Sequence, residues 1–121
     1  MDRKTFERLV KEALNELPEE FQEKLENVAV VVEEWPTPAQ LALARIRPPG
    51  TLLGLYHGVP KTKRGSYYSA LPDKITIFAG PILATSPNQE AVKERVKQVV
   101  RHEIAHHFGF SEQKVRKAES H

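Results

Sequence analysis

Hydrophobic positions follow the helical period through the first part of the chain. Residues three and four apart are apolar, and they are Phe6, Leu9, Val10, Ala13, Leu14 and Leu17. This pattern predicts an amphipathic helix that Asp2 caps and Pro18 ends. A second helical segment follows, in which Phe21 and Leu25 provide the apolar side. Two helices are therefore expected before the first strand.

β-branched and aromatic runs predict three strands after these helices. They cover residues 28–32, a run typical of a buried strand, and then residues 52–57 and 74–78. Thr37 followed by Pro38 has the N-cap and first-position chemistry of a helix, so one or two helical turns are expected over residues 39–44. The polar segment 58–72 is long for a loop in a compact domain, which favours a functional role.

A second apolar stripe predicts a long helix near the C-terminus, and it consists of Val92, Val96, Val99 and Val100. Ser86 as N-cap and Pro87 at the first position provide a strong helix start. The helix is expected to reach Phe108, because Gly109 stands where a C-cap glycine belongs. A short terminal helix is expected over residues 111–117.

The long helix carries His102, Glu103 and His106, a spacing typical of a helical zinc-hydrolase site. Residues four apart lie one above the other on a helix, so both imidazoles can bind one tetrahedral metal ion. Glu103 lies beside the pair, where it can accept a proton from a water that the metal acidifies. The alternative is that both histidines are ordinary residues of an amphipathic helix. The glutamate between them and the well-capped helix around them favour the metal site.

Extending the valine stripe along the helix places Glu103 and His107 near its centre. A buried carboxylate needs a charged neighbour, access to water or a raised pKa, and a metal cleft supplies the first two. His107 is expected to be a packed or hydrogen-bonded neighbour of the site. A contact between His107 and Glu103, four residues apart, is one such arrangement.

A catalytic zinc site needs a third protein ligand, and without cysteine in the chain this ligand is His, Asp or Glu. Gly109 lets the chain leave the helix and fold back, which favours Glu112 from the following turn. The remaining candidates are Glu119, His121 and His57. Zinc (Zn2+) is the expected metal, although two histidines and a carboxylate also accept Fe²⁺, Mn²⁺, Co²⁺ or Ni²⁺.

The length of 121 residues and the 40% hydrophobic content predict one globular domain over residues 1–121. The N-terminus lacks an apolar signal core and no apolar run is long enough to span a bilayer, so we expect a cytoplasmic protein. Charge is uneven: residues 1–34 hold ten acids and five bases, and residues 35–121 hold six acids and thirteen bases. A solvated basic surface explains this excess more simply than nucleic-acid binding does.

Several segments resemble, in the same order along the chain, the small bacterial zincin-like metallopeptidases, which are sometimes described as minimal zincins. The segments are Leu52 to Tyr56, Arg64-Gly65 with Tyr67-Tyr68, Leu71 to Ile77, and His102 to Gly109. The likeness extends over most of the chain from about Val28 onward. It implies an α+β fold, a single compact zincin-like domain with a small mixed β-sheet and a C-terminal active-site helix.

The motif of that family has the form H-E-x-x-H-x-x-G-x-x-[D/E], and this chain contains it. The resemblance implies that His102 and His106 are zinc ligands, that Glu103 is the general base, and that Glu112 is the acidic third ligand. Glutamate stands at this last position where aspartate is commoner in the family. Its extra methylene changes the reach of the carboxylate.

The function predicted from these residues is zinc-dependent hydrolysis of a peptide or protein substrate. A substrate in extended form can pair with an exposed edge of the sheet, and the strand at residues 75–78 is the first candidate for this edge. The oxyanion of the reaction also needs a donor, for which Tyr56, Tyr67, Tyr68 and His57 are the candidates.

Two other functions are consistent with the motif. The first is a zincin-like domain that binds a metal or a peptide without cleaving it. The second is a metal-dependent ribonuclease, suggested by the basic C-terminal part. Small hydrolases that process ribosomal RNA typically carry a third histidine downstream and lack a glutamate after the first one. Glu103 and Glu112 therefore argue against the ribonuclease, and no oligomeric state is predicted.

Overall fold

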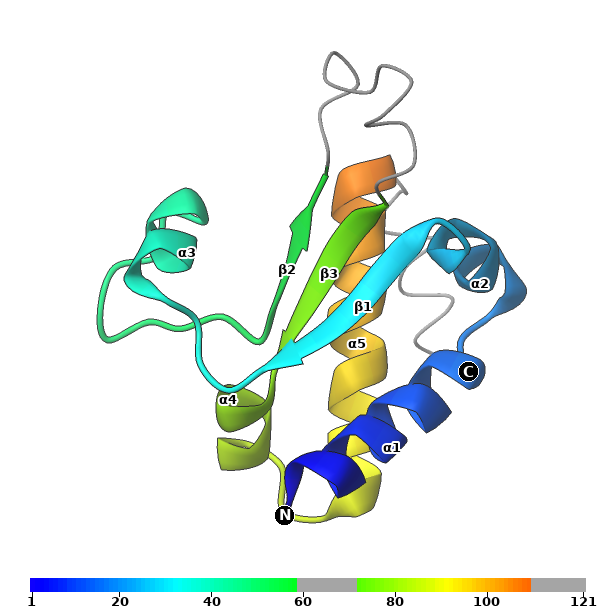
Figure 1. Cartoon of the computed structure of the whole chain (residues 1–121), viewed down its shortest axis with the longest axis horizontal. Coiled ribbons are helices and arrows are strands. Elements are labelled where there is room, and N and C mark those ends of the chain that lie inside the picture. Colours follow the sequence, from blue (N-terminus) through cyan, green and yellow to red (C-terminus); the bar gives the residue numbers. More distant parts are fainter. Residues whose placement is uncertain (59–71, 110–121) are drawn as a thin grey trace.

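The computed structural model describes residues 1–58 and 72–109, and it shows a three-stranded sheet with helices around it (Figure 1). The elements are α1 (Arg3–Asn15), α2 (Glu19–Leu25), β1 (Val28–Glu33), α3 (Pro38–Leu43), β2 (Gly54–His57), β3 (Asp73–Phe78), α4 (Ala79–Ala84) and α5 (Gln89–Phe108). Most of the predicted loop 58–72 and the whole predicted helix 111–117 lie outside the described residues. No helix in the described ranges is long and apolar enough to cross a membrane.

The sheet is mixed, with the strand order β1-β3-β2, so the predicted α+β fold is confirmed. β1 pairs with β3 in parallel, beginning with Val28 opposite Asp73, whereas β2 pairs with β3 antiparallel, with Gly54 opposite Ile77. Because β3 has a neighbour on both sides, the prediction that residues 75–78 offer an exposed edge is wrong. Within the described ranges, the edges of the sheet are β1 and β2.

The central position of β3 also explains how deeply each strand is buried. Ile75, Thr76, Ile77 and Phe78 of β3 are almost completely inaccessible. The valine-rich β1 was expected to be buried, but all six of its residues are only partly covered. An edge strand has a neighbour on one side only, and a run of β-branched residues cannot by itself distinguish the centre of a sheet from its edge.

The core lies between the sheet and two helices. α5 lies behind the sheet in Figure 1 and contacts β2, β3, α1, α2 and α4. The predicted apolar faces of α1 and α5 are both buried there, and they include Phe6, Leu9, Val10, Ala13, Val92, Val96, Val99 and Val100. Phe21 of α2 is buried as well. α5 is thus held from several sides, which makes it a rigid support for the side chains on its remaining face.

The core stripe of α5 continues through Ile104 and Ala105, and not through Glu103 and His107 as expected. Ile104 is 0% exposed, whereas Glu103 is half-buried and His107 is exposed. Ile104 lies four residues after Val100 and therefore stays on the same face of the helix. Glu103 lies at the border of the core, where its carboxyl keeps access to the surface.

Three of the predicted helix caps are present in the structure. The Asp2 carboxylate accepts the Thr5 N–H at 2.8 Å and caps α1. Thr37 caps α3 in a capping box, in which its side chain and that of Gln40 each accept a backbone N–H of the other residue. Gly109 ends α5 in the left-handed region, with φ of 72°, as predicted for a C-cap glycine.

The start of α5 differs from the prediction. Asn88, and not Ser86, is the N-cap, because its side chain accepts the Ala91 N–H at 2.9 Å. Asparagine is as good a cap as serine, so the two positions compete. The Ser86 N–H instead donates to the Leu83 carbonyl at 3.4 Å, at the end of the short helix α4, which was not predicted.

Gly54, the first residue of β2, allows this strand to approach α5 closely. A Cβ atom at this position would overlap with Cγ1 of Val99 on α5 and would lie 3.2 Å from the Thr76 carbonyl oxygen. We expect Gly54→Ala to lower the free energy of unfolding by about 1–3 kcal/mol through overpacking. Urea unfolding of the purified variant measures this loss.

The matched control is the double variant Gly54→Ala/Val99→Ala, which removes the overlapping methyl group. Because the two residues are in contact, the double variant should lose less stability than the sum of the two single variants. Unfolding midpoints that add up without coupling would contradict the close approach of β2 and α5.

Candidate functional site

The motif residues lie on the last two turns of α5, at one wall of a groove. His102 and His106 are one helical turn apart and exposed, and Glu103 beside them is half-buried. The segment that leads into β2 provides the opposite wall. The groove has a volume of about 360 Å³ and is lined by Thr51, Leu52, Leu53, Gly54, Arg95, Gln98, Val99, His102, Glu103 and His106. The fold therefore brings the three motif side chains together beside the edge strand.

Burial changes the acidity of Glu103. Desolvation raises the pKa of its carboxyl above the ordinary value of 4.5, and the charge of the nearby His106 opposes this only in part. A carboxyl whose pKa is raised is a stronger base than an exposed carboxylate. This property suits a group that takes up a proton and later releases it.

The raised pKa predicts a pH dependence of stability in the metal-free protein. The folded chain holds the Glu103 proton more tightly than the unfolded chain, so this group contributes stability at acid pH. The contribution is lost as the pH rises from 4.5 through the raised pKa. We expect metal-free Glu103→Gln to lose less stability than the wild type over this pH range. Urea unfolding in the presence of a chelator measures both profiles, and coinciding profiles would contradict the prediction.

The described residues provide two of the three protein ligands that a catalytic zinc site needs. Two imidazoles four residues apart on a helix are a pair that zinc takes in hydrolase sites, and both are accessible from the groove. The described residues contain no group of three or more potential ligands, so His57 does not complete the set. Glu112, Glu119 and His121 lie outside the described residues. The third ligand therefore stays a prediction.

A cluster of three side chains fixes the end of α5 next to the motif. The Tyr56 hydroxyl of β2 donates to the Asp73 carboxylate of β3 at 2.7 Å. The ring of His107 stacks on Tyr56, with centroids 3.9 Å apart, and its Nε2 lies 3.8 Å from the same carboxylate. His107 is thus a packed neighbour of the site, as predicted, and it packs against Tyr56 and Asp73 of the sheet and Phe108 of α5.

Arg95 and Gln98 were not predicted as site residues, although both line the groove. Arg95 lies seven residues and Gln98 four residues before His102, so both lie on the same face of α5 as the histidine. This spacing was visible in the sequence. The sequence did not show that the segment before β2 lies opposite this face of α5 and forms the other wall of the groove.

Comparisons with known proteins bear on the fold and the family of this chain. A solved structure of a conserved hypothetical protein from Thermus thermophilus is similar to this chain, with a TM-score of 0.59 at 23% sequence identity. The match covers 89% of this chain and 94% of that protein, and at this identity it supports the fold alone. Among curated proteins, none matches significantly. The sequence pattern of the zincin-like metallopeptidases, however, matches residues 25–121, from just before β1 to the last residue. The chain therefore belongs to the zincin-like metallopeptidase family.

Proposed function

We propose that this protein is a zinc-dependent peptidase in which Glu103 is the general base. The observation that carries the proposal is the placement of a half-buried carboxyl with a raised pKa next to two exposed imidazoles, one turn apart, in a groove beside an edge strand. Family membership supports the same reaction class. His102, His106 and Glu112 would hold the metal.

Bound zinc supplies Lewis acidity, which polarises a scissile carbonyl and makes an attacking water more acidic. Glu103 takes the proton of this water onto a carboxylate oxygen. The same oxygen then donates the proton to the nitrogen of the leaving amine, so the carboxylate is regenerated at the end of the cycle. Because Ile104 and the other core residues of α5 are fixed by packing, the position of Glu103 at the groove is fixed as well.

The substrate would be a peptide in extended form. β2 is an edge strand in the described ranges, and its entering segment lines the groove that holds the motif. A peptide that pairs with β2 would therefore lie across His102, Glu103 and His106. This replaces the edge of residues 75–78 that the sequence suggested.

The described residues exclude one of the four candidate donors to the oxyanion. The Tyr56 hydroxyl already donates its hydrogen to Asp73, so it is not a suitable donor. His57 is exposed at the end of β2 and remains a candidate, and Tyr67 and Tyr68 lie outside the described residues.

The proposal is tested by digestion of a peptide library with the full-length protein. The zinc-reloaded wild type should cleave a set of the peptides, mass spectrometry should identify new termini, and a chelator should stop the reaction. Zinc binding at one site per chain together with an intact library would instead favour a zincin-like domain that binds without cleaving.

A further inference from the structure

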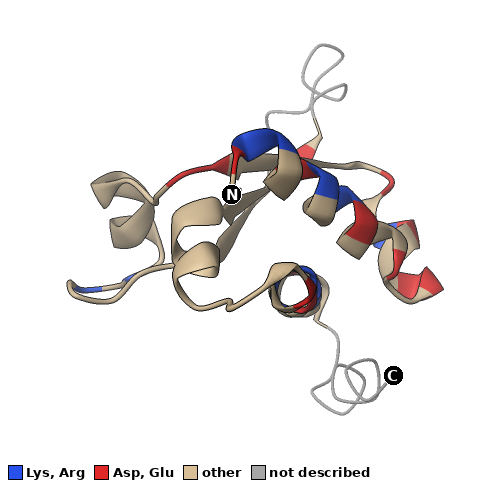
Figure 2. Ribbon diagram, turned by 90° about the horizontal axis from the view of Figure 1, so that it is seen from below, with Lys and Arg blue, Asp and Glu red and all other residues tan. Residues whose placement is uncertain are grey.

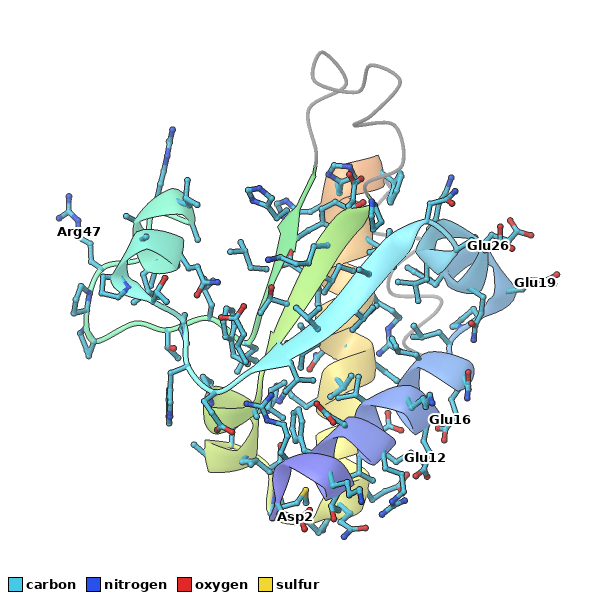
Figure 3. All side chains as sticks on the ribbon, viewed as in Figure 1. Asp2, Glu12, Glu16, Glu19, Glu26 and Arg47 are labelled. Atoms are coloured by element: carbon cyan, nitrogen blue, oxygen red, sulfur yellow. The ribbon has the colours of Figure 1, made fainter. Side chains whose placement is uncertain are left out.

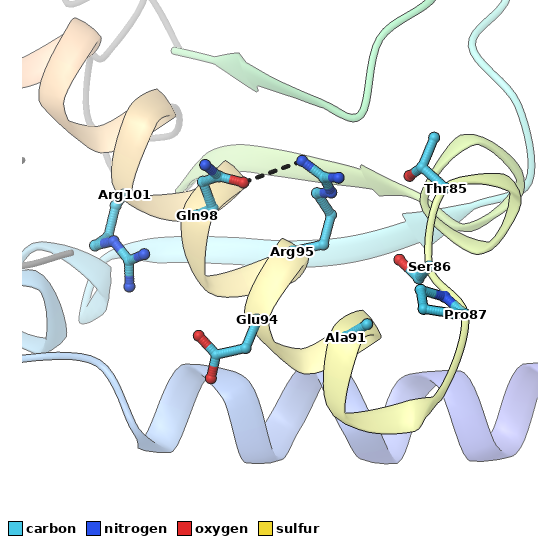
Figure 4. A pocket seen from close by; sticks show the side chains of 8 residues that line it. All are labelled: Thr85, Ser86, Pro87, Ala91, Glu94, Arg95, Gln98 and Arg101. Carbon is cyan, nitrogen blue, oxygen red and sulfur yellow. Dashed lines mark hydrogen bonds between the residues drawn. The ribbon is translucent and has the colours of Figure 1, made fainter. Parts of the chain in front are cut away.

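A second hollow adjoins the groove that holds the motif, farther toward the start of α5. This hollow has a volume of about 520 Å³ and lies between α5 and the chain that connects α4 to α5 (Figure 4). Arg95 and Gln98 line both spaces, so they stand at the boundary between the two. A ligand that extends from His102 toward the start of α5 would therefore enter the hollow past Arg95.

Arg95 presents a cationic group to this boundary. Its side chain is half-buried, and Nη1 donates to Oε1 of Gln98 at 3.2 Å. In Figure 4 both side chains lie on one side of α5, and Glu94 points to the other side. No carboxylate in the described ranges lies within ion-pair distance of Arg95. Its guanidinium therefore keeps most of its five donors for another partner.

Two lysines near Arg95 on α5 differ from it, because both form ion pairs with acidic side chains. Lys93 and Lys97 pair with Glu16 of α1, at 2.6 and 2.9 Å. α1 carries both basic and acidic residues along its length (Figure 2). Lys97 also pairs with Glu94 at 2.8 Å, so the acidic residue that lines the hollow is already neutralised. Among the described residues, these acidic side chains therefore pair with the lysines, and Arg95 has no acidic partner.

Two buried polar groups in the same hollow also lack partners. Ser86 Oγ is buried and makes no hydrogen bond in the described structure. Arg101, which is only 8% exposed, lines the other end of the hollow, and its Nε has no hydrogen-bond partner. Buried polar groups are nearly always hydrogen-bonded in folded proteins, so these two groups leave unmet hydrogen-bonding capacity in the walls of the hollow.

We propose that this hollow is a subsite for a carboxylate of the peptide substrate, and that Arg95 is the residue that binds it. The carboxylate is either an Asp or Glu side chain or the C-terminus of the peptide, because a planar guanidinium recognises both in the same way. The proposal rests on the proposed peptidase function and names the substrate class of that site.

The spacing along α5 sets where the carboxylate lies in the peptide. Arg95 and His102 are seven residues apart, which corresponds to roughly 10 Å along a helix axis. An extended peptide covers this length in about three residues. The acidic residue or the C-terminus should therefore lie about three residues from the scissile bond, on the side that reaches the start of α5.

The test measures binding to the zinc-loaded Glu103→Gln protein, which should hold peptides without cleaving them. The probes are fluorescein-labelled alanine-based decapeptides that carry one Glu, one Gln or one Lys at each position in turn, with a free or an amidated C-terminus. Fluorescence anisotropy gives Kd for each probe. Arg95→Gln removes the cation, Arg95→Glu reverses it, and Arg47→Gln is the matched control, because Arg47 is exposed and far from α5 (Figure 3).

We expect Glu at one position, or the free C-terminus, to lower Kd by about tenfold relative to Gln or to the amide. Arg95→Gln should abolish this ratio and Arg47→Gln should retain it. Arg95→Glu should invert it, so that a Lys probe binds better than a Glu probe, which a merely misfolded protein would not do. A dependence on Glu identifies the side chain as the source of the carboxylate, and a dependence on amidation identifies the C-terminus.

The proposal is overturned if no probe binds, or if neither Glu nor amidation changes Kd in a way that depends on Arg95. Its failure is distinguishable from failure of the proposed function. A zinc-loaded wild type that cleaves no peptide but shows the Arg95-dependent ratio would keep the subsite and refute the peptidase. Cleavage with no preference for acidic residues or free C-termini would keep the peptidase and refute the subsite.

Discussion

Replacement of Glu103 by glutamine is expected to lower peptide hydrolysis by about 10²- to 10⁴-fold, the usual contribution of general acid–base catalysis. Glutamine has nearly the same shape as glutamate but cannot take up a proton. The half-buried position of Glu103 at the border of the core should tolerate this change, because the neutral amide is less costly to bury than the carboxylate. Initial rates on one peptide from the library measure the loss.

The control for this variant is Glu90→Gln, which makes the same chemical change at an exposed position in the first turn of α5. It should retain the activity of the wild type. Zinc content should stay at the wild-type level in both variants, since neither residue is proposed as a ligand. Glu103→Gln that still turns over at the wild-type rate would contradict the role of Glu103 as the base.

His106→Ala is expected to weaken zinc binding by more than about 100-fold, because complete zinc sites gain roughly 10–16 kcal/mol from a small number of ligands. His106 is exposed at the surface of α5, so its removal should leave the fold intact. Zinc content after dialysis against a weak chelator, together with a competition titration, measures the effect. The loss of activity should follow the loss of metal.

His57→Ala is the matched control for His106→Ala. His57 is also exposed and was a candidate ligand in the sequence, but the described residues do not group it with the motif histidines. This variant should bind zinc as tightly as the wild type. Equal losses of zinc from both variants would mean that His57 is a ligand and that the proposed ligand set is wrong.

Local signals in the sequence predicted the helices of this protein well. The apolar faces of α1 and α5 followed from side chains three and four residues apart, and both are buried. The caps Asp2 and Thr37 and the C-cap Gly109 were predicted from chemistry that acts within one helical turn. The motif on α5 was also local, so its placement on one helical face needed no knowledge of the rest of the fold.

Features that depend on residues distant in sequence were predicted less well. The central place of β3 depends on which strands pair with it, and a run of β-branched residues does not contain this information. The stack of His107 on Tyr56 joins two residues that are 51 positions apart in the numbering. The groove likewise needs Gly54, whose missing side chain brings β2 against Val99. Two adequate caps, Ser86 and Asn88, also compete at the start of α5, and the local sequence does not show that the helix begins after Asn88.

The most direct measurement is X-ray absorption spectroscopy of the zinc-reloaded wild type, beside Glu112→Ala. One zinc per chain is expected, with scattering from two imidazoles at about 2.0–2.1 Å and an oxygen ligand that Glu112→Ala removes or replaces. Such a spectrum would show a metal held by two histidines and an acidic third ligand, as proposed for His102, His106 and Glu112. Zinc that is lost on dialysis, or a bound zinc without imidazole scattering, would contradict the proposed metal centre on α5.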